Sequence, residues 1–457
     1  MAYSTIDKST TNFNTKLYTG TGTSHNITGV GFQPDWVWVK NRDINTDAPT
    51  IYDAVRGATK RLQTSSSGAE STKTNGLIAF GSDGYTAGSA SAINANGSNL
   101  VSWNWLAGGA SPAITYAVKV VSDSGNKYRF DDFGTSAVTL DLQEGGTYTF
   151  DQSDSSNSGH PLRFSTTSNG SHGGGSEYTT GVTTNGTPGS SGAYTRITVA
   201  ASAPTLYYYC TNHSAMGGQA NTNSTFGSSN FKGDVQSLVS ANTDAGFSIV
   251  KVSNLNSNSF GHGLNGTPDL VISKRTDNTA NWRVYYTGIT SGNSLFLNTT
   301  AGSSSEGSRI GSTDATTVTA VGSANGGNAG TGTSINYCFQ SITGYSKFGS
   351  YTGNGNADGT FVYTGFKPAF VMVKIAVGNT GGWDMLDNKR DTFNPTDQIL
   401  QANSNAAEAD SDDIDFLSNG FKIRNTSGNH NGNGNTFIYM AFGQTIVGSN
   451  NVPATAR

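Results

Sequence analysis

Four side chains that can bind a metal lie in two short segments of this 457-residue sequence. Cys210, His213 and Met216 stand at three-residue intervals directly after an apolar run, and His160 lies fifty residues upstream. One thiolate, two imidazoles and a thioether are the ligand set with which proteins hold copper for one-electron transfer. We therefore predict that these four residues bind one copper ion in a type 1 site.

Strands must hold these ligands in place. The apolar run 206–209 is followed directly by Cys210, so a strand would hold the thiol in a fixed position. The tight loop after it would bring His213 and Met216 back to the same ion. Further β-forming runs separated by Gly and Ser turns show the period-2 pattern of a small sandwich. They lie at 127–130, 138–142, 146–151 and 195–199. We predict a β-sandwich domain over residues 115–222.

This segment resembles the cupredoxin family. The loop Cys-x2-His-x2-Met is similar to the short copper loop of amicyanin-type members, and His160 stands where the family supplies its first histidine. The resemblance implies a Greek-key sandwich. The segment departs from the family pattern in two places. Pro161 stands where many members have Asn, and a Gly/Ser/Thr-rich insertion occupies 165–192. We interpret His172, within the insertion, as a surface residue. The alternative is that Cys210 is a buried apolar residue of a domain that binds no metal.

The rest of the chain contains an internal repeat of about a hundred residues, which is the length of a whole domain. Each copy has a Gly/Pro turn followed by an apolar strand, at 31–40, 266–275 and 365–374. Each copy also closes with an aromatic strand, at 101–106, 335–339 and 436–442. We expect one shared fold, with Val37, Val271 and Val371 at equivalent positions.

The predicted fold class is all-β, with tandem β-sandwich or jelly-roll-like repeats and an inserted cupredoxin-like Greek-key sandwich. Short β-rich runs alternate with Gly, Asn, Asp and Ser turns throughout. The predicted boundaries are 1–114 for the first repeat, 115–222 for the inserted domain, 223–244 for a linker, 245–343 for the second repeat and 344–457 for the third.

Composition excludes several classes of protein. Charged residues make up 13% of the chain, the net charge is −4, and Lys and Arg form no dense cluster, so nucleic acid is not an expected partner. No apolar run approaches the roughly 20 residues of a membrane span. The first residues contain no hydrophobic signal core. We expect a chain that is made and kept in a cytoplasm unless it leaves as part of a particle.

The repeats resemble those of virion structural proteins of marine tailed phages, especially cyanophages, which are built from lectin-like β-sandwiches. The opening Ser-Thr-Ile-Asp-Lys-Ser and the segments 344–353, 361–368 and 415–421 carry this resemblance. It implies a non-enzymatic tail fibre or spike component that adheres to the host surface, or else a capsid-decorating head-fibre protein. The implied location is the virion, assembled in the host cytoplasm. The implied partners are other virion proteins and a host-surface glycan or protein. Because fibres and spikes are commonly trimers, we expect a homotrimer.

Two further interpretations concern sugars. Trp383, in Gly-Gly-Trp-Asp-Met, is the predicted carbohydrate-binding residue, whereas Trp36 and Trp38 share one face of a strand and are expected in the core. A polysaccharide-cleaving spike enzyme would need a pair of carboxyl groups. The candidate carboxylates form one run, for which solvated charge is the favoured interpretation: Glu408, Asp410, Asp412, Asp413 and Asp415. A copper redox protein is the remaining alternative.

Overall fold

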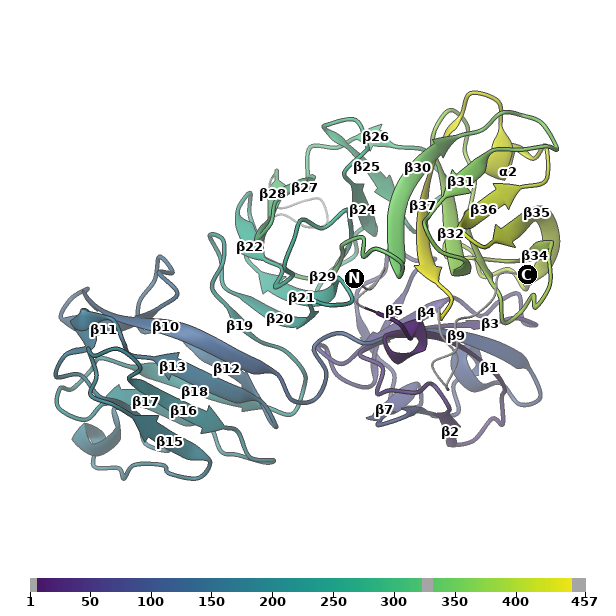
Figure 1. Ribbon diagram of the computed structural model, residues 1–457. Coiled ribbons are helices and arrows are strands. Elements are labelled where there is room, and N and C mark those ends of the chain that lie inside the picture. Colours follow the sequence, from purple (N-terminus) through teal and green to yellow (C-terminus); the bar gives the residue numbers. More distant parts are fainter. Residues whose placement is uncertain (1–5, 323–331, 446–457) are drawn as a thin grey trace.

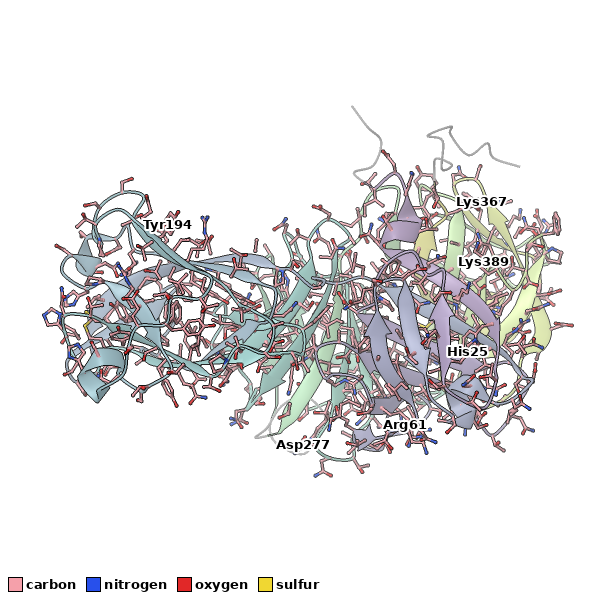
Figure 2. All side chains as sticks on the ribbon, turned by 90° about the horizontal axis from the view of Figure 1, so that it is seen from below. His25, Arg61, Tyr194, Asp277, Lys367 and Lys389 are labelled. Atoms are coloured by element: carbon pink, nitrogen blue, oxygen red, sulfur yellow. The ribbon has the colours of Figure 1, made fainter. Side chains whose placement is uncertain are left out.

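The computed structural model describes residues 6–322 and 332–445. It is all-β, as the sequence predicts, and three repeats form a body from which the inserted domain projects to one side (Figure 1). The helices of the described residues are single turns: η1 (Ser9–Thr11), η2 (Ser155–Asn157), η3 (Gly170–Gly173), α1 (Ser91–Asn94) and α2 (Gly428–Asn431). Figure 2 views the molecule from below, with Tyr194 on the inserted domain and Lys367 and Lys389 on the body.

The first repeat is a sandwich of a six-stranded and a three-stranded sheet. The large sheet has the order β1-β9-β3-β4-β5-β6 and the small one β2-β8-β7. Their bounds are β1 (Phe13–Thr19), β2 (His25–Thr28), β3 (Trp36–Asn41), β4 (Thr50–Asp53), β5 (Lys60–Gln63), β6 (Ser71–Thr72), β7 (Leu77–Gly81), β8 (Gly84–Ala87) and β9 (Asn99–Trp105).

The second repeat has an eight-stranded sheet, β19-β20-β21-β29-β23-β24-β25-β26, and a three-stranded sheet, β22-β28-β27. Their bounds are β19 (Ser228–Asn230), β20 (Ser237–Asn242), β21 (Phe247–Ser253), β22 (Ser259–Gly261), β23 (Leu270–Arg275), β24 (Arg283–Tyr286), β25 (Asn293–Phe296), β26 (Ser304–Ser305), β27 (Arg309–Thr313), β28 (Thr317–Val321) and β29 (Thr333–Phe339).

In the third repeat the two layers join into one nearly closed eight-stranded sheet, β30-β37-β32-β33-β34-β35-β36-β31. Its strands are β30 (Ser346–Thr352), β31 (Phe361–Tyr363), β32 (Pro368–Val377), β33 (Trp383–Asp387), β34 (Thr396–Gln401), β35 (Ala409–Leu417), β36 (Gly420–Ile423) and β37 (Thr436–Gly443).

The three repeats share one strand order, which confirms the predicted repeat. In each, the aromatic closing strand lies between a strand from the start of the repeat and the strand after the Gly/Pro turn. These sets are β1-β9-β3, β21-β29-β23 and β30-β37-β32, and in the second repeat β19 and β20 extend the sheet beyond β21. The smaller layers correspond as well, as β2-β8-β7, β22-β28-β27 and β31-β36-β35. Val37, Val271 and Val371 occupy matching positions, each fully buried in the core between the layers of its own repeat.

The opposite faces of the three large sheets meet in one common core. Trp36 and Trp38 from the first repeat, Ile272 from the second and Phe370 from the third all belong to it. Because side chains alternate along a strand, the central strands bury one face inside their own repeat and the other against the neighbouring repeats. The apolar strands after the Gly/Pro turns are therefore buried on both sides, and the three repeats form one packed body.

The inserted segment forms a two-sheet sandwich with its own core, to which Phe231 of the following segment also contributes. Its sheets have the orders β11-β10-β13-β16-β15 and β12-β18-β17-β14, and the pairs β10–β13 and β12–β18 are parallel. The strands are β10 (Ala113–Ser122), β11 (Asn126–Phe130), β12 (Leu140–Gln143), β13 (Thr147–Asp151), β14 (Leu162–Ser165), β15 (Val182–Asn185), β16 (Tyr194–Thr198), β17 (Leu206–Cys210) and β18 (Gly218–Asn223).

The segment 223–244 is not the free linker that its Ser, Asn and Gly content predicts. It contains β19 and β20, and β20 pairs along its whole length with β21 of the second repeat. Pairing with an existing sheet edge satisfies the backbone groups of these polar residues, so their composition did not reveal the strands. In the described part of the chain, no helix is long and apolar enough to span a membrane.

Candidate metal centre

Two paired strands bring the predicted ligands together. In the antiparallel pair β14–β17, Leu162 lies opposite Cys210. His160, two residues before Leu162, therefore lies beyond the end of β17, beside the loop that leads to β18. That loop carries His213 and Met216, so all four predicted residues come to one end of the sheet.

The ligand atoms of three of these residues form a compact group. Cys210 Sγ lies 3.8 Å from His160 Nδ1 and 3.7 Å from His213 Nδ1. The ligand atoms of the three residues all lie within 4.8 Å of one another, which makes the group a candidate metal site. Metal–sulfur and metal–nitrogen bonds of about 2.3 and 2.0 Å at a trigonal angle place sulfur and nitrogen about 3.7 Å apart. The observed spacing fits one shared ion.

Met216, the predicted axial ligand, is buried in the core of the inserted domain. Its backbone carbonyl accepts a hydrogen bond of 3.0 Å from the amide of Tyr128 on β11. The end of the loop is thereby fixed to the neighbouring sheet. Cys210 is also buried, whereas His160 is half-buried and His213 is exposed.

The backbone around His160 is held by three side-chain and main-chain groups. The His160 carbonyl accepts hydrogen bonds of 2.9 Å from the Tyr128 hydroxyl and 2.9 Å from Gln152 Nε2, and its amide donates to the Asn157 carbonyl at 2.8 Å. These bonds fix the position of the imidazole. Outer partners of this kind orient the ligands of metal sites.

The Gly/Ser/Thr-rich insertion packs onto the ligand loop, which the sequence did not predict. Asn169 Oδ1 accepts a hydrogen bond of 2.7 Å from the amide of Ala215, and His172 Nε2 lies 3.0 Å from the carbonyl oxygen of Cys210. A carbonyl oxygen only accepts, so His172 donates from Nε2. His172 is exposed, as predicted, and serves as a support for Cys210.

The local environment favours the metal-binding form of His160. Burial lowers the pKa of His160, and the nearby His213 ring lowers it further. A neutral imidazole is the form that binds a metal ion. Burial also raises the pKa of the Tyr128 hydroxyl, with a further contribution from Cys210, so this hydroxyl remains protonated and able to donate.

The prediction for Trp383 is wrong. Its side chain is 1% exposed and belongs to the common core of the three repeats, and its Nε1 donates to the carbonyl of Phe296 in the second repeat at 2.9 Å. The ring has no free face for a sugar. The Gly-Gly segment before it looked like an exposed loop, but it leads into a strand at a contact between repeats.

Two residues of the acidic run form ion pairs, instead of the solvated charge that the sequence predicts. Glu408 binds Arg42 of the first repeat at 2.5 Å and Arg390 of its own repeat at 2.9 Å, and Asp415 binds Arg424 at 3.3 Å. The side chains of Asp412 and Asp413 lie outside the described part of the structure. Glu408 therefore joins two repeats through its charge.

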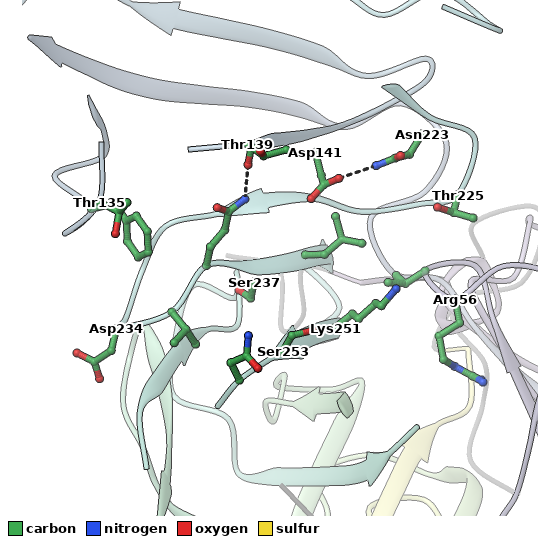
Figure 3. Close-up of a pocket in the computed structure, with 16 residues that line it drawn as sticks. Arg56, Thr135, Thr139, Asp141, Asn223, Thr225, Asp234, Ser237, Lys251 and Ser253 are labelled. Atoms are coloured by element: carbon green, nitrogen blue, oxygen red, sulfur yellow. Dashed lines mark hydrogen bonds between the residues drawn. The ribbon is translucent and has the colours of Figure 1, made fainter. Parts of the chain in front are cut away.

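A polar groove of about 830 Å³ separates the inserted domain from the body (Figure 3). Thr139, Asp141 and Asn223 line it from the inserted domain, and Arg56 and Lys251 line it from the repeats. Within it Asn223 donates to Asp141 at 3.0 Å. The candidate metal centre lies elsewhere: its loop contacts β11, which stands at the end of the inserted domain farthest from the repeats (Figure 1).

Fold and site together define an all-β protein in which a sandwich with a candidate metal centre is inserted into a three-repeat body. The model of the family described as Domain of unknown function (DUF7483) matches residues 8–128 and 213–445, and the chain belongs to this family. The match leaves out residues 129–212, which include His160 and Cys210. Searches of curated proteins and of solved structures found no match.

Proposed function

We propose that this chain is a non-enzymatic structural and adhesion component of a tailed-phage particle, and that its inserted domain binds one copper ion. The particle role rests on the resemblance of the repeats to phage virion proteins. The packing of three sandwiches around one core supports it, because a rigid body of this kind can hold binding loops in fixed positions.

The copper proposal rests on the convergence of His160, Cys210 and His213. A thiolate with two imidazoles suits copper, and a buried methionine on the same loop fits the weak axial position. In this proposal Cys210 binds as the thiolate, both histidines bind through Nδ1, and Met216 approaches from the core. When bound, copper would supply one-electron chemistry.

Electron transfer by the inserted domain is a second candidate function, favoured by the position of the site. His213 is exposed, and its loop contacts β11 at the end of the domain that lies farthest from the body, where a redox partner can reach it. A rapid change of the copper absorption on mixing with a one-electron donor would support this role. Unchanged absorption in the presence of donors that reduce free copper(II) would count against it.

The position of this chain in the particle distinguishes a tail-fibre or spike protein from a head-fibre protein. Antibodies against the inserted domain, applied to purified particles and viewed by electron microscopy, are expected to label the tail fibre or spike. Label on the capsid would favour the head-fibre alternative, and particles that contain none of this chain would refute the particle role. Turnover of host polysaccharide by the purified chain would instead favour the spike-enzyme alternative.

The expected homotrimer is a separate proposal. The large sheets of the three repeats already cover one another within one chain, so a trimer would have to use other surfaces. Sedimentation equilibrium of the purified chain measures this directly.

A further inference from the structure

The outer face of the small layer in the third repeat carries exposed aromatic rings. β31 lies at the edge of the sheet, and its middle residue, Val362, points into the core. The two residues beside it, Phe361 and Tyr363, point outward and are 43% and 62% exposed. Single exposed apolar residues are common on protein surfaces, so exposure alone does not indicate a site.

The other two repeats provide an internal comparison. The registers β31–β36 and β2–β8 superpose so that Phe361 corresponds to Asn26 and Tyr363 to Thr28. In the second repeat the same two positions hold Ser259 and Gly261.

The shared fold therefore does not need aromatic rings at these positions. The corresponding strand has the same pairing in all three repeats. In two of the repeats it carries small or polar residues at these positions. In the first repeat, Asn26 instead accepts a hydrogen bond of 2.8 Å from Thr86 across the strands. The rings of the third repeat are an addition to the fold, and exposed additions of this kind indicate binding.

Charged side chains lie on or beside the strands next to β31. Lys422, directly opposite Phe361 on β36, pairs with Asp358 at 2.5 Å, and Arg424 pairs with Asp415 at 3.3 Å. Two cations and two carboxylates balance, so the rim residues that the structure describes carry no net charge. Held in ion pairs, these groups are placed to exchange hydrogen bonds with a ligand that carries many hydroxyls.

Opposite Tyr363 the sheet presents Gly420, which has no side chain to cover the ring. A Cβ at position 420 would lie 2.1 Å from the backbone oxygen of Val362, so glycine is required there. The close approach of the two strands therefore also keeps the face of Tyr363 open.

We propose that this face, formed by Phe361, Tyr363, Lys422, Asp358, Asp415 and Arg424, binds a neutral oligosaccharide. The negative faces of aromatic rings attract the C–H groups of a sugar ring, and the rim binds its hydroxyls. A neutral sugar fits because the rim charges cancel. A protein partner fits less well, because a stable interface buries about 800 Å² on each side and two half-exposed rings supply much less.

The proposal rests on the adhesion role above for its biological meaning, but it does not involve copper. Failure of the copper titration would leave it unaffected. Failure of sugar binding would leave the copper proposal unaffected. It would show only that this face of the third repeat takes no part in the adhesion role.

Native affinity electrophoresis of the full chain in gels that contain mannan, dextran, xylan or alginate tests the proposal. We expect at least one neutral polysaccharide to retard the chain, and the double variant Phe361→Asn/Tyr363→Thr to weaken that binding by about tenfold or more. This variant carries the residues of the first repeat, so it is compatible with the fold. The matched control, Asn26→Ala/Thr28→Ala, should bind as the native chain does.

Three results of the electrophoresis would overturn the proposal. In the first, none of the neutral polysaccharides retards the chain. In the second, the native chain and the Phe361→Asn/Tyr363→Thr variant are retarded equally. In the third, only alginate retards the chain. Self-association that the same variant abolishes in sedimentation would likewise overturn it, in favour of a protein-docking face. Circular dichroism and thermal unfolding of each variant check that the fold is retained.

Discussion

The hydroxyl of Tyr337 in the second repeat donates a 2.8 Å hydrogen bond to the buried carboxylate of Asp53 in the first. Asp53 also binds Arg56 at 2.5 Å. The third repeat makes the corresponding contact: Asp387 accepts a 3.1 Å hydrogen bond from Trp103 of the first repeat and pairs with Arg390. A carboxylate at the same place in two repeats thus reaches the closing strand of a neighbour.

Removal of the Tyr337 hydroxyl should destabilise the whole body. In Tyr337→Phe the buried Asp53 loses one partner, which typically costs about 1–3 kcal/mol. Because all three repeats share one core, urea should unfold them in a single transition that shifts to lower urea concentration. Tyr363→Phe, which removes an exposed hydroxyl, is the control and should leave the midpoint unchanged. Separate transitions for the repeats would show that the common core does not couple them.

Asp35 should make the stability of the body depend on pH. It is buried, it accepts hydrogen bonds from the amides of Ala107 at 2.8 Å and Gly109 at 2.9 Å, and burial raises its pKa to about 7. Since this pKa lies above the value in the unfolded chain, the folded state binds more protons between about pH 4 and 7. Stability therefore falls as the pH rises through this range, by up to about 4 kcal/mol, and then levels off.

The variant Asp35→Asn should lack this loss of stability. Urea unfolding at a series of pH values from 4 to 8 measures it, with Asp132→Asn, an exposed carboxylate, as the control. If the native chain and Asp35→Asn show the same pH dependence, Asp35 is ionised in the folded state like an ordinary carboxylate.

Asn169 should support the metal centre. It accepts a hydrogen bond from Ala215, whose φ of 60° is unusual for a residue with a side chain, directly before Met216. In Asn169→Ala the loop loses this restraint, and copper affinity should fall by about tenfold or more, as for other outer partners of metal sites. Competition with a chelator of known affinity measures the change. Asn185→Ala, in the same insertion but bound to Gly192, should have native affinity; a similar loss there would remove any specific role of Asn169.

Much of this architecture could be predicted because local patterns determine it. The Gly/Pro turns and aromatic closing strands predicted the repeats, and the spacing of Cys210, His213 and Met216 predicted their common loop. The packing of one repeat on another could not be predicted, since a strand buried against its own repeat and a strand buried against a neighbour have the same apolar pattern. Trp383 was misassigned for this reason.

The residues that support the metal centre also could not be predicted from local sequence patterns. Tyr128, Asn169 and His172 reach the site from β11 and from the insertion, and nothing in their own neighbourhoods distinguishes them from ordinary polar or aromatic residues. Their contribution depends on how distant segments pack.

Addition of copper(II) to the purified chain, followed by absorption spectroscopy, tests the copper site most directly. The account predicts one ion per chain and an intense thiolate-to-copper band, because the Cys210 sulfur must lose its proton and bond to the ion. Cys210→Ser should abolish the band, whereas Met216→Leu should keep it with a changed reduction potential. Copper binding without the band, or equal binding by Cys210→Ser, would contradict the account and leave the inserted domain a β-sandwich without a copper site.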